Sequence, residues 1–537
     1  MERRRGKGRL IRSIPVLGAA LGACLVVTPW AVLDAPAAEK GGKLVFAARQ
    51  DIDTLDPQVT SRAATRKILL QFMDPLVRLK PGDSKIHPGL AESWEVSADG
   101  KSFTFRLRKG VRFHDGTPFN AEAVKFTFDR TREPASSTGV ARSFLGPYRS
   151  AEVLDKHTVR VHFDKPYAFL PMAALSPLAP ASPTAVKKMG TEFGRRPVGT
   201  GPFMVKEWVT KDHVTLVRNP QYNWASPIFK HQGPAYLDEI EWKFVLEATT
   251  RAAVLQTGEV KAAEDIAYQD VKVLERDPNL RLLRGTPAGT PWTIFPNLQK
   301  SPTSELAVRQ ALHHAIDKAA ILRVVFHGQS AAAWSPLQPT TPAHHAALAP
   351  YAFNPARARE ILEAAGWKAG SDGIRIKEGK RLELLWIFGT NNGYEEMAPL
   401  VQAQAREVGI DIQLREQPRV QMQDANRKGV HNIGEVNWWF PDPSILTTIF
   451  HSTRLQSFNV SKLASPELDQ LLDQAAGHPD AAERAQLYRR IQEIVAKEAA
   501  AIPLVDQVSL VGVRKEVRDY AFSFVTFPLL YDVHIER

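Results

Sequence analysis

Three aromatic side chains follow one another in the segment Asn437-Trp-Trp-Phe-Pro-Asp-Pro443. Trp and Phe rings stack on flat or apolar parts of small molecules, so they supply binding rather than bond-breaking chemistry. The preceding stretch, 431–436, is expected to be extended, and side chains of an extended chain alternate between two faces. Trp438, Trp439 and Phe440 therefore cannot all point the same way: one or two of them are candidates to face a ligand while the other packs inside the protein, and packing of all three in the core is the alternative.

Polar groups flank these aromatic residues. Asn437 offers an amide that can donate and accept hydrogen bonds, and Glu435 and Asp442 are the nearest carboxylates. Asp442 is also a candidate ligand contact.

Motifs for catalysis are missing from the sequence. It contains no G-x-S-x-G turn, no H-E-x-x-H pair and no Walker motif, and no pair of carboxylates is singled out for acid–base work. His313-His314 and His344-His345 have no acid or third histidine placed with them, so packed or surface histidines are favoured over a metal site. We expect no catalytic residue, no bound metal and no cofactor.

Local structure can be predicted most clearly for the segment Pro88–Arg130. Alternating apolar residues on both sides of Asp99-Gly100 predict a β-hairpin, because Asp and Gly accept the positive φ of a tight turn. Asn120 is expected to cap a helix that follows. Strands are also predicted at 153–163, 203–208, 214–218, 236–244, 382–387 and 410–414, and helices at 249–258, 305–321, 354–367, 397–408, 468–475 and 483–499.

The same segment, PGLAESWEVSADGKSFTFRLRKGVRFHDGTPFNAEAVKFTFDR, resembles the signature of the family 5 solute-binding proteins, the extracytoplasmic receptors of ABC importers for peptides, nickel complexes and related solutes. Further matching segments follow in the family's order from about residue 43 to beyond 500. They include Leu55-Asp-Pro57, Val198-Gly-Thr-Gly-Pro-Phe203, Asn219-Pro-Gln-Tyr222, Glu305–Ile321 and Asn354–Trp367.

The resemblance implies an α/β periplasmic-binding-protein fold of the large three-domain type, in which two lobes are joined by a hinge and an extra domain is inserted. The implied division is a signal peptide at 1–38, lobe I at 39–73, the inserted domain II at 74–195, lobe I again at 196–288, lobe III at 289–502, and a return to lobe I at 503–537. The lobes are expected to close on a ligand by hinge motion.

The resemblance also locates a ligand site. In peptide-binding relatives, an aspartate in the segment that matches 437–443 pairs with the α-amino group of the ligand. Here that position falls on or near Trp439, so a cationic amine would lose a charge-assisted hydrogen bond, worth about 1.5–3 kcal/mol. Further candidates come from segments expected near the cleft: Ser61, Arg62, Trp292, Trp334, Trp386 and Asn391.

The implied function is that of a monomeric receptor that captures a small organic solute and delivers it to an ABC permease in the membrane. A modified peptide, an opine-like or sugar-like compound, or a metal chelate is the first expectation for the ligand, and a plain peptide is the second. A secreted hydrolase and a purely sensory or chaperone receptor remain as alternatives.

Composition agrees with a soluble globular protein rather than a nucleic-acid-binding one. The 537 residues are 44% hydrophobic and 24% charged, and the net charge is +11. The first 38 residues contain six basic and two acidic side chains, and no basic run or nucleic-acid motif follows them. Cys24 is the single cysteine, so the chain contains no disulfide framework.

The N-terminus has the layout of a secretory signal peptide: a basic start, an apolar run and small residues that favour cleavage after Ala37 or Ala38. This predicts a periplasmic protein. An uncleaved membrane anchor is one alternative. A second is a lipoprotein acylated at Cys24, because Leu21-Gly22-Ala23-Cys24 resembles a lipobox, although the chain stays apolar after it.

Overall fold

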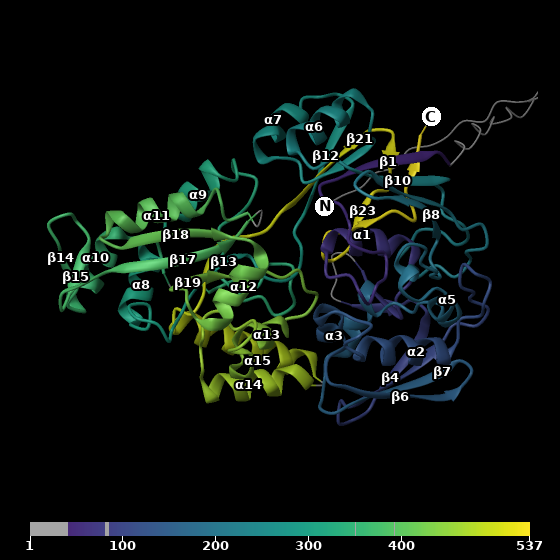
Figure 1. Cartoon of the computed structure of the whole chain (residues 1–537), viewed down its shortest axis with the longest axis horizontal. Helices are drawn as coiled ribbons and strands as arrows, with labels where there is room; N and C mark the ends of the chain where they lie inside the picture. The colour runs from purple at the N-terminus through teal and green to yellow at the C-terminus, as the bar shows by residue number, and fades with distance from the viewer. Residues whose placement is uncertain (1–40, 81–84, 349–350, 391–392, 479, 537) are drawn as a thin grey trace, which may run out of the picture. The chain divides into compact units, whose positions relative to one another are not determined.

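The computed structural model describes residues 41–80, 85–348, 351–390, 393–478 and 480–536 (Figure 1). The largest sheet in this part of the chain combines parallel and antiparallel neighbours: β1 runs parallel to β10 and β11, and β21 runs antiparallel to β11 and β12. In spatial order its strands are β12 (Leu280–Gly285), β21 (Ser509–Arg514), β11 (Ala262–Glu264), β1 (Lys43–Ala48), β10 (Glu239–Phe244), β9 (His213–Arg218) and β8 (Phe203–Val209).

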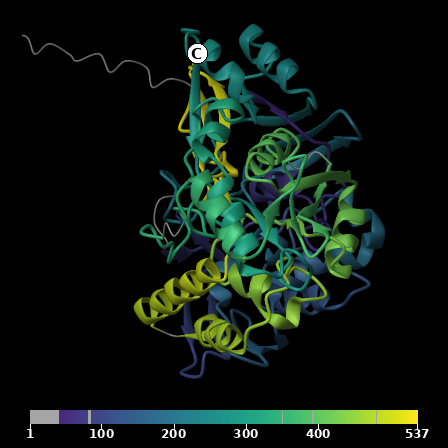
Figure 2. The ribbon, with the colours of Figure 1, turned by 90° about the vertical axis from the view of Figure 1, so that its left-hand side faces the viewer.

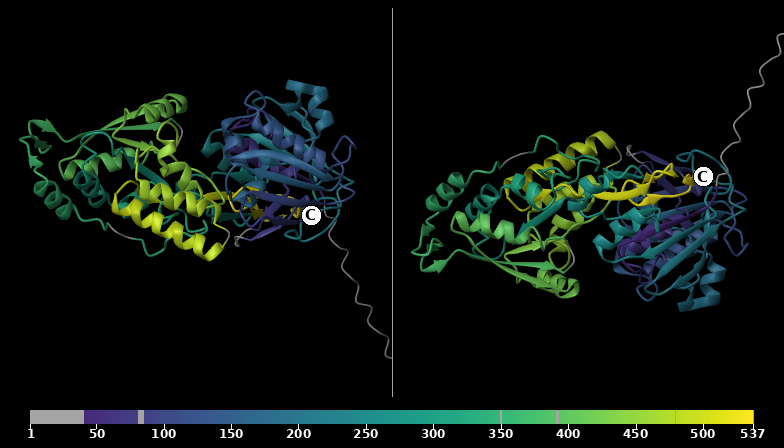
Figure 3. Two further views of the ribbon diagram at one scale, coloured as in Figure 1. Left: turned by 90° about the horizontal axis from the view of Figure 1, so that it is seen from below. Right: turned by 90° about the horizontal axis from the view of Figure 1, so that it is seen from above.

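A second mixed sheet is formed by residues from 292 to 505. Its strands, in spatial order, are β18 (Asp411–Gln417), β17 (Glu383–Gly389), β19 (Ile433–Glu435), β13 (Trp292–Pro296) and β20 (Ile502–Val505). The chain therefore passes from the first sheet to the second between Gly285 and Trp292, and back between Val505 and Ser509. Figure 3 shows the result, because the end marked C lies beside purple and blue strands rather than among the green helices.

The third sheet confirms the hairpin predicted around Asp99-Gly100. Its strands, in spatial order, are β4 (Ala91–Val96), β5 (Ser102–Leu107), β7 (Thr158–Phe163) and β6 (Tyr148–Asp155). Gly100 has a φ of +65°, as the tight turn requires. Phe103 and Phe105 are buried, and helix α2 (Ala121–Arg132) packs on the sheet. Asn120 caps α2 by accepting a hydrogen bond from the Ala123 N–H at 3.1 Å, also as predicted.

Short strand pairs and helices complete the described part. The short strands are β2 (Val77–Leu79), β3 (Ile86–Pro88), β14 (Lys368–Ala369), β15 (Arg375–Lys377), β16 (Lys380–Arg381), β22 (Val517–Arg518), β23 (Ala521–Phe522), β24 (Pro528–Leu529) and β25 (His534–Ile535). The helices up to residue 315 are α1 (Ala63–Phe72), α2 (Ala121–Arg132), α3 (Gly139–Leu145), α4 (Phe169–Ala173), α5 (Pro183–Met189), α6 (Ala248–Thr257), α7 (Val271–Leu274) and α8 (Leu306–Ala315).

The later helices lie with the second sheet. They are α9 (Lys318–Val324), α10 (Pro355–Ala364), α11 (Ala398–Glu407), α12 (Arg419–Lys428), α13 (Ile445–Phe450), α14 (Pro466–Gly477) and α15 (Ala481–Lys497). Helices α11 and α12 pack on strands β17 and β18, and α14 and α15 lie side by side, as Figures 1 and 2 both show.

Two differences from the predicted elements have clear local causes. The helix expected over 305–321 is divided into α8 and α9, because Asp317 caps α9 by accepting a hydrogen bond from the Ala320 N–H at 3.0 Å. Helix α12 was not predicted, because its sequence RVQMQDANRK has few apolar residues to mark a buried face. Its ends nevertheless carry ordinary signals, with Pro418 before the helix and Gly429 in the left-handed conformation after it.

The predictions for the N-terminus, including the signal peptide and the acylation of Cys24, lie outside the described residues. Within the described ranges, no helix has both the length and the apolar character needed to cross a bilayer.

Burial of His431 makes stability depend on pH. This side chain is fully buried beside the Val460 carbonyl oxygen, 2.9 Å from its Nε2, and burial lowers its pKa to about 4. An unfolded histidine titrates near pH 6.5, so between about pH 6.5 and 4 the unfolded chain binds a proton that the folded chain does not. The free energy of unfolding should therefore be highest above pH 6.5 and fall below it by up to about 1.4 kcal/mol per pH unit.

Urea unfolding at several pH values measures this effect. His431→Gln should reduce the slope between pH 6.5 and 4, whereas the control His327→Gln, at an exposed position, should preserve it. An unchanged slope in His431→Gln would assign the pH dependence to other groups.

Candidate functional site

The aromatic segment 437–440 lies against the first connection between the two larger sheets. The Thr290 N–H donates to the Trp438 carbonyl oxygen at 2.9 Å, and the Phe440 N–H donates to the Ala288 carbonyl oxygen at 2.9 Å. Gly289 between them has a φ of +128°, and a Cβ atom there would lie 1.9 Å from the Trp438 carbonyl oxygen. The backbone contact therefore requires glycine at this position.

Trp438 faces a cavity of about 210 Å³ beside the second sheet. The ring lies edge-on to Phe458, with 5.1 Å between the ring centres. Its indole Nε1 is buried and has no hydrogen-bond partner among the described residues. Asn437 and several polar side chains of α12 also line this cavity, which can therefore accommodate a small molecule with both apolar and polar parts.

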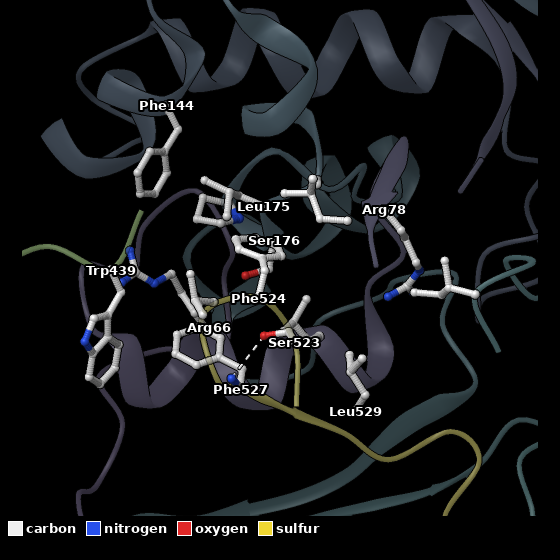
Figure 4. Close-up of a pocket in the computed structure, with 16 residues that line it drawn as sticks. Arg66, Arg78, Phe144, Leu175, Ser176, Trp439, Ser523, Phe524, Phe527 and Leu529 are labelled. Carbon is white, nitrogen blue, oxygen red and sulfur yellow. Dashed lines mark hydrogen bonds between the residues drawn. The ribbon is translucent and has the colours of Figure 1, made fainter. Parts of the chain in front are cut away.

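Trp439 points in the opposite direction, toward α1 and the C-terminal residues. Its Nε1 donates to Gln507 Oε1 at 2.8 Å, and its ring lies edge-on to Phe527 with 5.9 Å between the centres. Lys67 Nζ lies 5.9 Å from the centre of the Trp439 ring. Trp439 lines a second cavity with Arg66 and Phe144 (Figure 4). The alternation expected along the segment thus places the two tryptophans in different cavities.

Phe440 and Asp442 are engaged by the protein itself. Phe440 is 6% exposed and packs against Phe144, with 5.9 Å between the ring centres. Both carboxylate oxygens of the buried Asp442 accept hydrogen bonds from Arg484, at 2.6 and 2.9 Å. Asp442 Oδ1 also accepts from the Ser444 N–H at 2.9 Å, just before α13.

The surroundings of Asp442 keep it charged. Burial alone would raise the pKa of Asp442, but the Arg484 guanidinium and its hydrogen bonds lower it overall. This geometry favours a structural role for Asp442 over ligand contact, and we leave it out of the proposed site.

The remaining candidates are dispersed. Ser61 and Arg62 are exposed just before α1, and Arg62 Nη1 donates to the Asp51 carbonyl oxygen at 3.3 Å. Trp292 is half-buried and meets Tyr394 edge-on, with 5.3 Å between the ring centres. None of Ser61, Arg62 and Trp292 lines either of the two cavities.

Two other tryptophans lie away from segment 437–440. Trp334 lines a separate small cavity, where Lys318 Nζ lies 3.9 Å above its ring, and Trp386 is fully buried in the core of the second sheet. We leave both out of the proposed site. Asn391 lies outside the described residues.

The structure adds charged residues that the sequence pattern did not reveal. A buried ion pair joins Lys67 of α1 to Glu264 of β11, next to Trp439. Arg66 and Arg419 line the cavities of Trp439 and Trp438 respectively. An isolated Arg or Lys in a helix carries no distinctive spacing, so these residues could be found only once the fold had brought the helices together.

Comparison with known proteins identifies the family. Residues 85–457 match the model of the bacterial extracellular solute-binding proteins, family 5. The glutathione-binding protein GsiB of Shigella flexneri is 31% identical over 479 residues, covering 86% of this chain and 88% of GsiB. GsiB of Escherichia coli K12 is 30% identical, with the same coverage of both chains.

Solved structures show the same fold. The periplasmic binding protein DppA of Helicobacter pylori, in complex with the peptide STSA, superposes with a TM-score of 0.79 at 27% identity, covering 93% of this chain and 99% of DppA. NikA of Brucella suis, in complex with Fe(III)-EDTA, gives a TM-score of 0.81 at 26% identity, covering 92% of this chain and 99% of NikA. The fold is thus the multi-domain periplasmic-binding-protein type. The chain belongs to the bacterial extracellular solute-binding proteins of family 5, the solute-capturing components of ABC importers.

Proposed function

We propose that this protein captures a small organic solute beside segment 437–440 and delivers it, chemically unaltered, to a membrane permease. One observation carries the proposal: Trp438 and Trp439 line two cavities on either side of a segment that is bonded to the connection between the two sheets. A solute that contacts both rings would make more contacts when the parts of the molecule approach each other, and such differential contact shifts an open–closed equilibrium.

We propose that the hinge is formed by the two connections between the larger sheets, residues 286–291 and 506–508. Each is short, and the two are cross-linked because Gln507 Nε2 donates to the Thr290 carbonyl oxygen at 2.6 Å. Gln507 also accepts the hydrogen bond from Trp439, so the ligand-facing tryptophan is attached to the proposed hinge. The division into lobe I, inserted domain II and lobe III, with boundaries near 74, 196, 289 and 503, is part of the same proposal.

The ligand class follows from the charged groups near the tryptophans. Relatives include proteins named or solved with glutathione, a peptide and an iron chelate. In this chain Asp442 is held by Arg484, and Glu435 accepts a hydrogen bond from the Gly389 N–H at 3.3 Å. Asp442 therefore does not replace the amine anchor of the peptide-binding relatives, and Glu435, which lines the Trp438 cavity, stands before the position that the resemblance gives to that anchor. We propose a peptide-like, opine-like or chelate solute whose recognition does not depend on a free α-amino group.

We also propose that the protein acts as a monomer, that it is a receptor rather than an enzyme, and that it is exported to the periplasm. It is supported by relatives that are binding proteins and by an N-terminal sequence of the secretory type.

Thermal unfolding in the presence of single solutes tests the proposal. A panel of glutathione, the peptide STSA, mannopinic acid and Fe(III)-EDTA should contain at least one compound that raises the Tm, because a ligand at 100 times its Kd stabilises the folded state by about 2.7 kcal/mol. Mass spectrometry should recover that compound unchanged. Conversion of the compound would favour a hydrolase, and the absence of any shift would exclude these ligand classes.

A further inference from the structure

Arg66 of α1 has an unusual environment. Its side chain extends into the cavity shared with Trp439 and Phe144 (Figure 4), and its guanidinium carbon lies 5.7 Å from the centre of the Phe144 ring. Among the described residues, this guanidinium has no ion pair within 4 Å and no hydrogen bond. A partly buried cation without an anionic partner is costly, and folded proteins usually pair it.

Arg419 lies on the other side of segment 437–440, at the first position of α12. Its side chain is exposed and lines the Trp438 cavity, to which Glu435 also contributes, and in the described part of the chain its guanidinium has no ion pair within 4 Å. The two arginines affect each other, because the pKa of Arg66 is lowered to about 10, first by burial and then by the charge of Arg419. Asp53 opposes this effect, but its Oδ1 already accepts hydrogen bonds from the hydroxyls of Thr60 and Thr65, each at 2.8 Å.

The two helices add to the positive potential. The N-terminus of a helix carries a partial positive charge, which acidic residues in the first turn or a capping side chain normally offset. Neither α1 nor α12 has an acidic residue in its first turn or a side-chain cap, and Arg62 and Arg419 stand at their starts instead. Each helix therefore has a positively charged side chain beside its partially positive N-terminus, which is an unfavourable arrangement.

Several buried or partly buried arginines of the described chain are instead held by carboxylates. Arg78 bonds to Asp74 at 2.6 Å, Arg130 bonds to Asp56, and Arg484 bonds to Asp442. Arg66 differs from these three arginines, because it has no ion pair among the described residues and lines the cavity in which the proposed solute would lie.

We propose that Arg66 and Arg419 together bind an oxyanion of the solute, a carboxylate or a phosphate, while the indole rings of Trp438 and Trp439 contact the remainder. Guanidinium groups hold such oxyanions through paired N–H···O hydrogen bonds. The two arginines line different cavities, so one oxyanion would contact both only when those cavities approach each other, and it would then offset the mutual repulsion and favour the closed arrangement. The inference rests on the proposed function and adds the charge of its ligand.

Isothermal titration calorimetry with paired probes tests this inference. Glutathione is compared with its diethyl ester, and glycerol 3-phosphate with glycerol, so that carboxylate and phosphate are distinguished. Arg66→Gln and Arg419→Gln should each weaken binding of the anionic probe by about tenfold or more. The matched control Lys428→Gln, at an exposed position at the other end of α12 that lines neither cavity, should change it by less than about threefold.

A second measurement needs no solute. Iodide, a small anion, quenches tryptophan fluorescence on contact, and the two arginines should concentrate it near Trp438 and Trp439. Iodide should quench the wild type roughly twofold more efficiently than the double variant Arg66→Gln/Arg419→Gln, whereas neutral acrylamide should quench both equally. This difference should vanish when Trp438 and Trp439 are replaced by Phe.

The two measurements distinguish failure of the anion site from failure of the proposed transport function. A solute that binds the arginine variants as tightly as the wild type, or an ester that binds as tightly as its acid, would overturn the inference and leave the transport function intact. Equal iodide quenching would also overturn it. Iodide quenching that depends on the arginines, with no solute shifting the Tm, would support the anion site and count against the proposed function.

Discussion

Replacing Arg484 with methionine is expected to lower the free energy of unfolding by about 3–5 kcal/mol, because it leaves the carboxylate of Asp442 buried without its partner. The Asp442 side chain is 4% exposed and that of Arg484 is 16% exposed, so water cannot replace the lost hydrogen bonds. Urea unfolding followed by far-UV circular dichroism measures the effect.

Arg490→Met is the matched control on the same helix, α15. Arg490 pairs with Glu467 at 2.9 Å, but both side chains are more than 60% exposed, and exposed pairs contribute about 1 kcal/mol or less. Equal destabilisation by the two substitutions would contradict the structural role given to Asp442. A double variant, Asp442→Leu/Arg484→Met, should recover part of the loss, because it removes both charges.

At least one of Trp438→Ala and Trp439→Ala is expected to weaken solute binding by about 1–3 kcal/mol, the range for loss of a buried aromatic contact. Trp438 faces the larger cavity, and its indole N–H has no hydrogen-bond partner among the residues that the structure describes, whereas the indole N–H of Trp439 donates to Gln507 at the proposed hinge. Titration with whichever solute of the panel raises the Tm gives the change in Kd.

Trp334→Ala is the control for this pair, because Trp334 is also half-buried but lines a separate cavity with Lys318. It should leave the Kd unchanged. Wild-type affinity in both Trp438→Ala and Trp439→Ala, with folding intact, would show that the solute binds elsewhere.

Local patterns allowed much of the fold to be predicted. The Asp99-Gly100 hairpin, the Asn120 cap and the helix after Asn354 are specified by turn and capping residues close to one another in sequence, and the structure confirms each of them. The break between α8 and α9 depends on one side chain, Asp317, turning back to cap a new helix inside an apolar pattern that runs through it.

The candidate site was predicted in part. The alternation along 437–440 correctly implied that neighbouring aromatic residues would face different sides, since this follows from an extended backbone. Arg66 and Arg419 could not be picked out from the sequence, because their lining of the two cavities and their lack of an ion pair within 4 Å among the described residues are properties of the folded molecule. Trp334 and Trp386 illustrate the converse, because a tryptophan in a favourable segment can equally line a small cavity elsewhere or fill the core.

Native mass spectrometry of the protein purified from its own host tests the central claim most directly. The account predicts one small solute bound per chain, carrying a carboxylate or phosphate, released on unfolding with its mass unchanged after incubation with fresh protein, and reduced or lost in Trp439→Ala and Arg66→Gln. A chain that carries no solute and binds none from the host's extracellular extract, or a recovered compound whose mass shows cleavage, would contradict it.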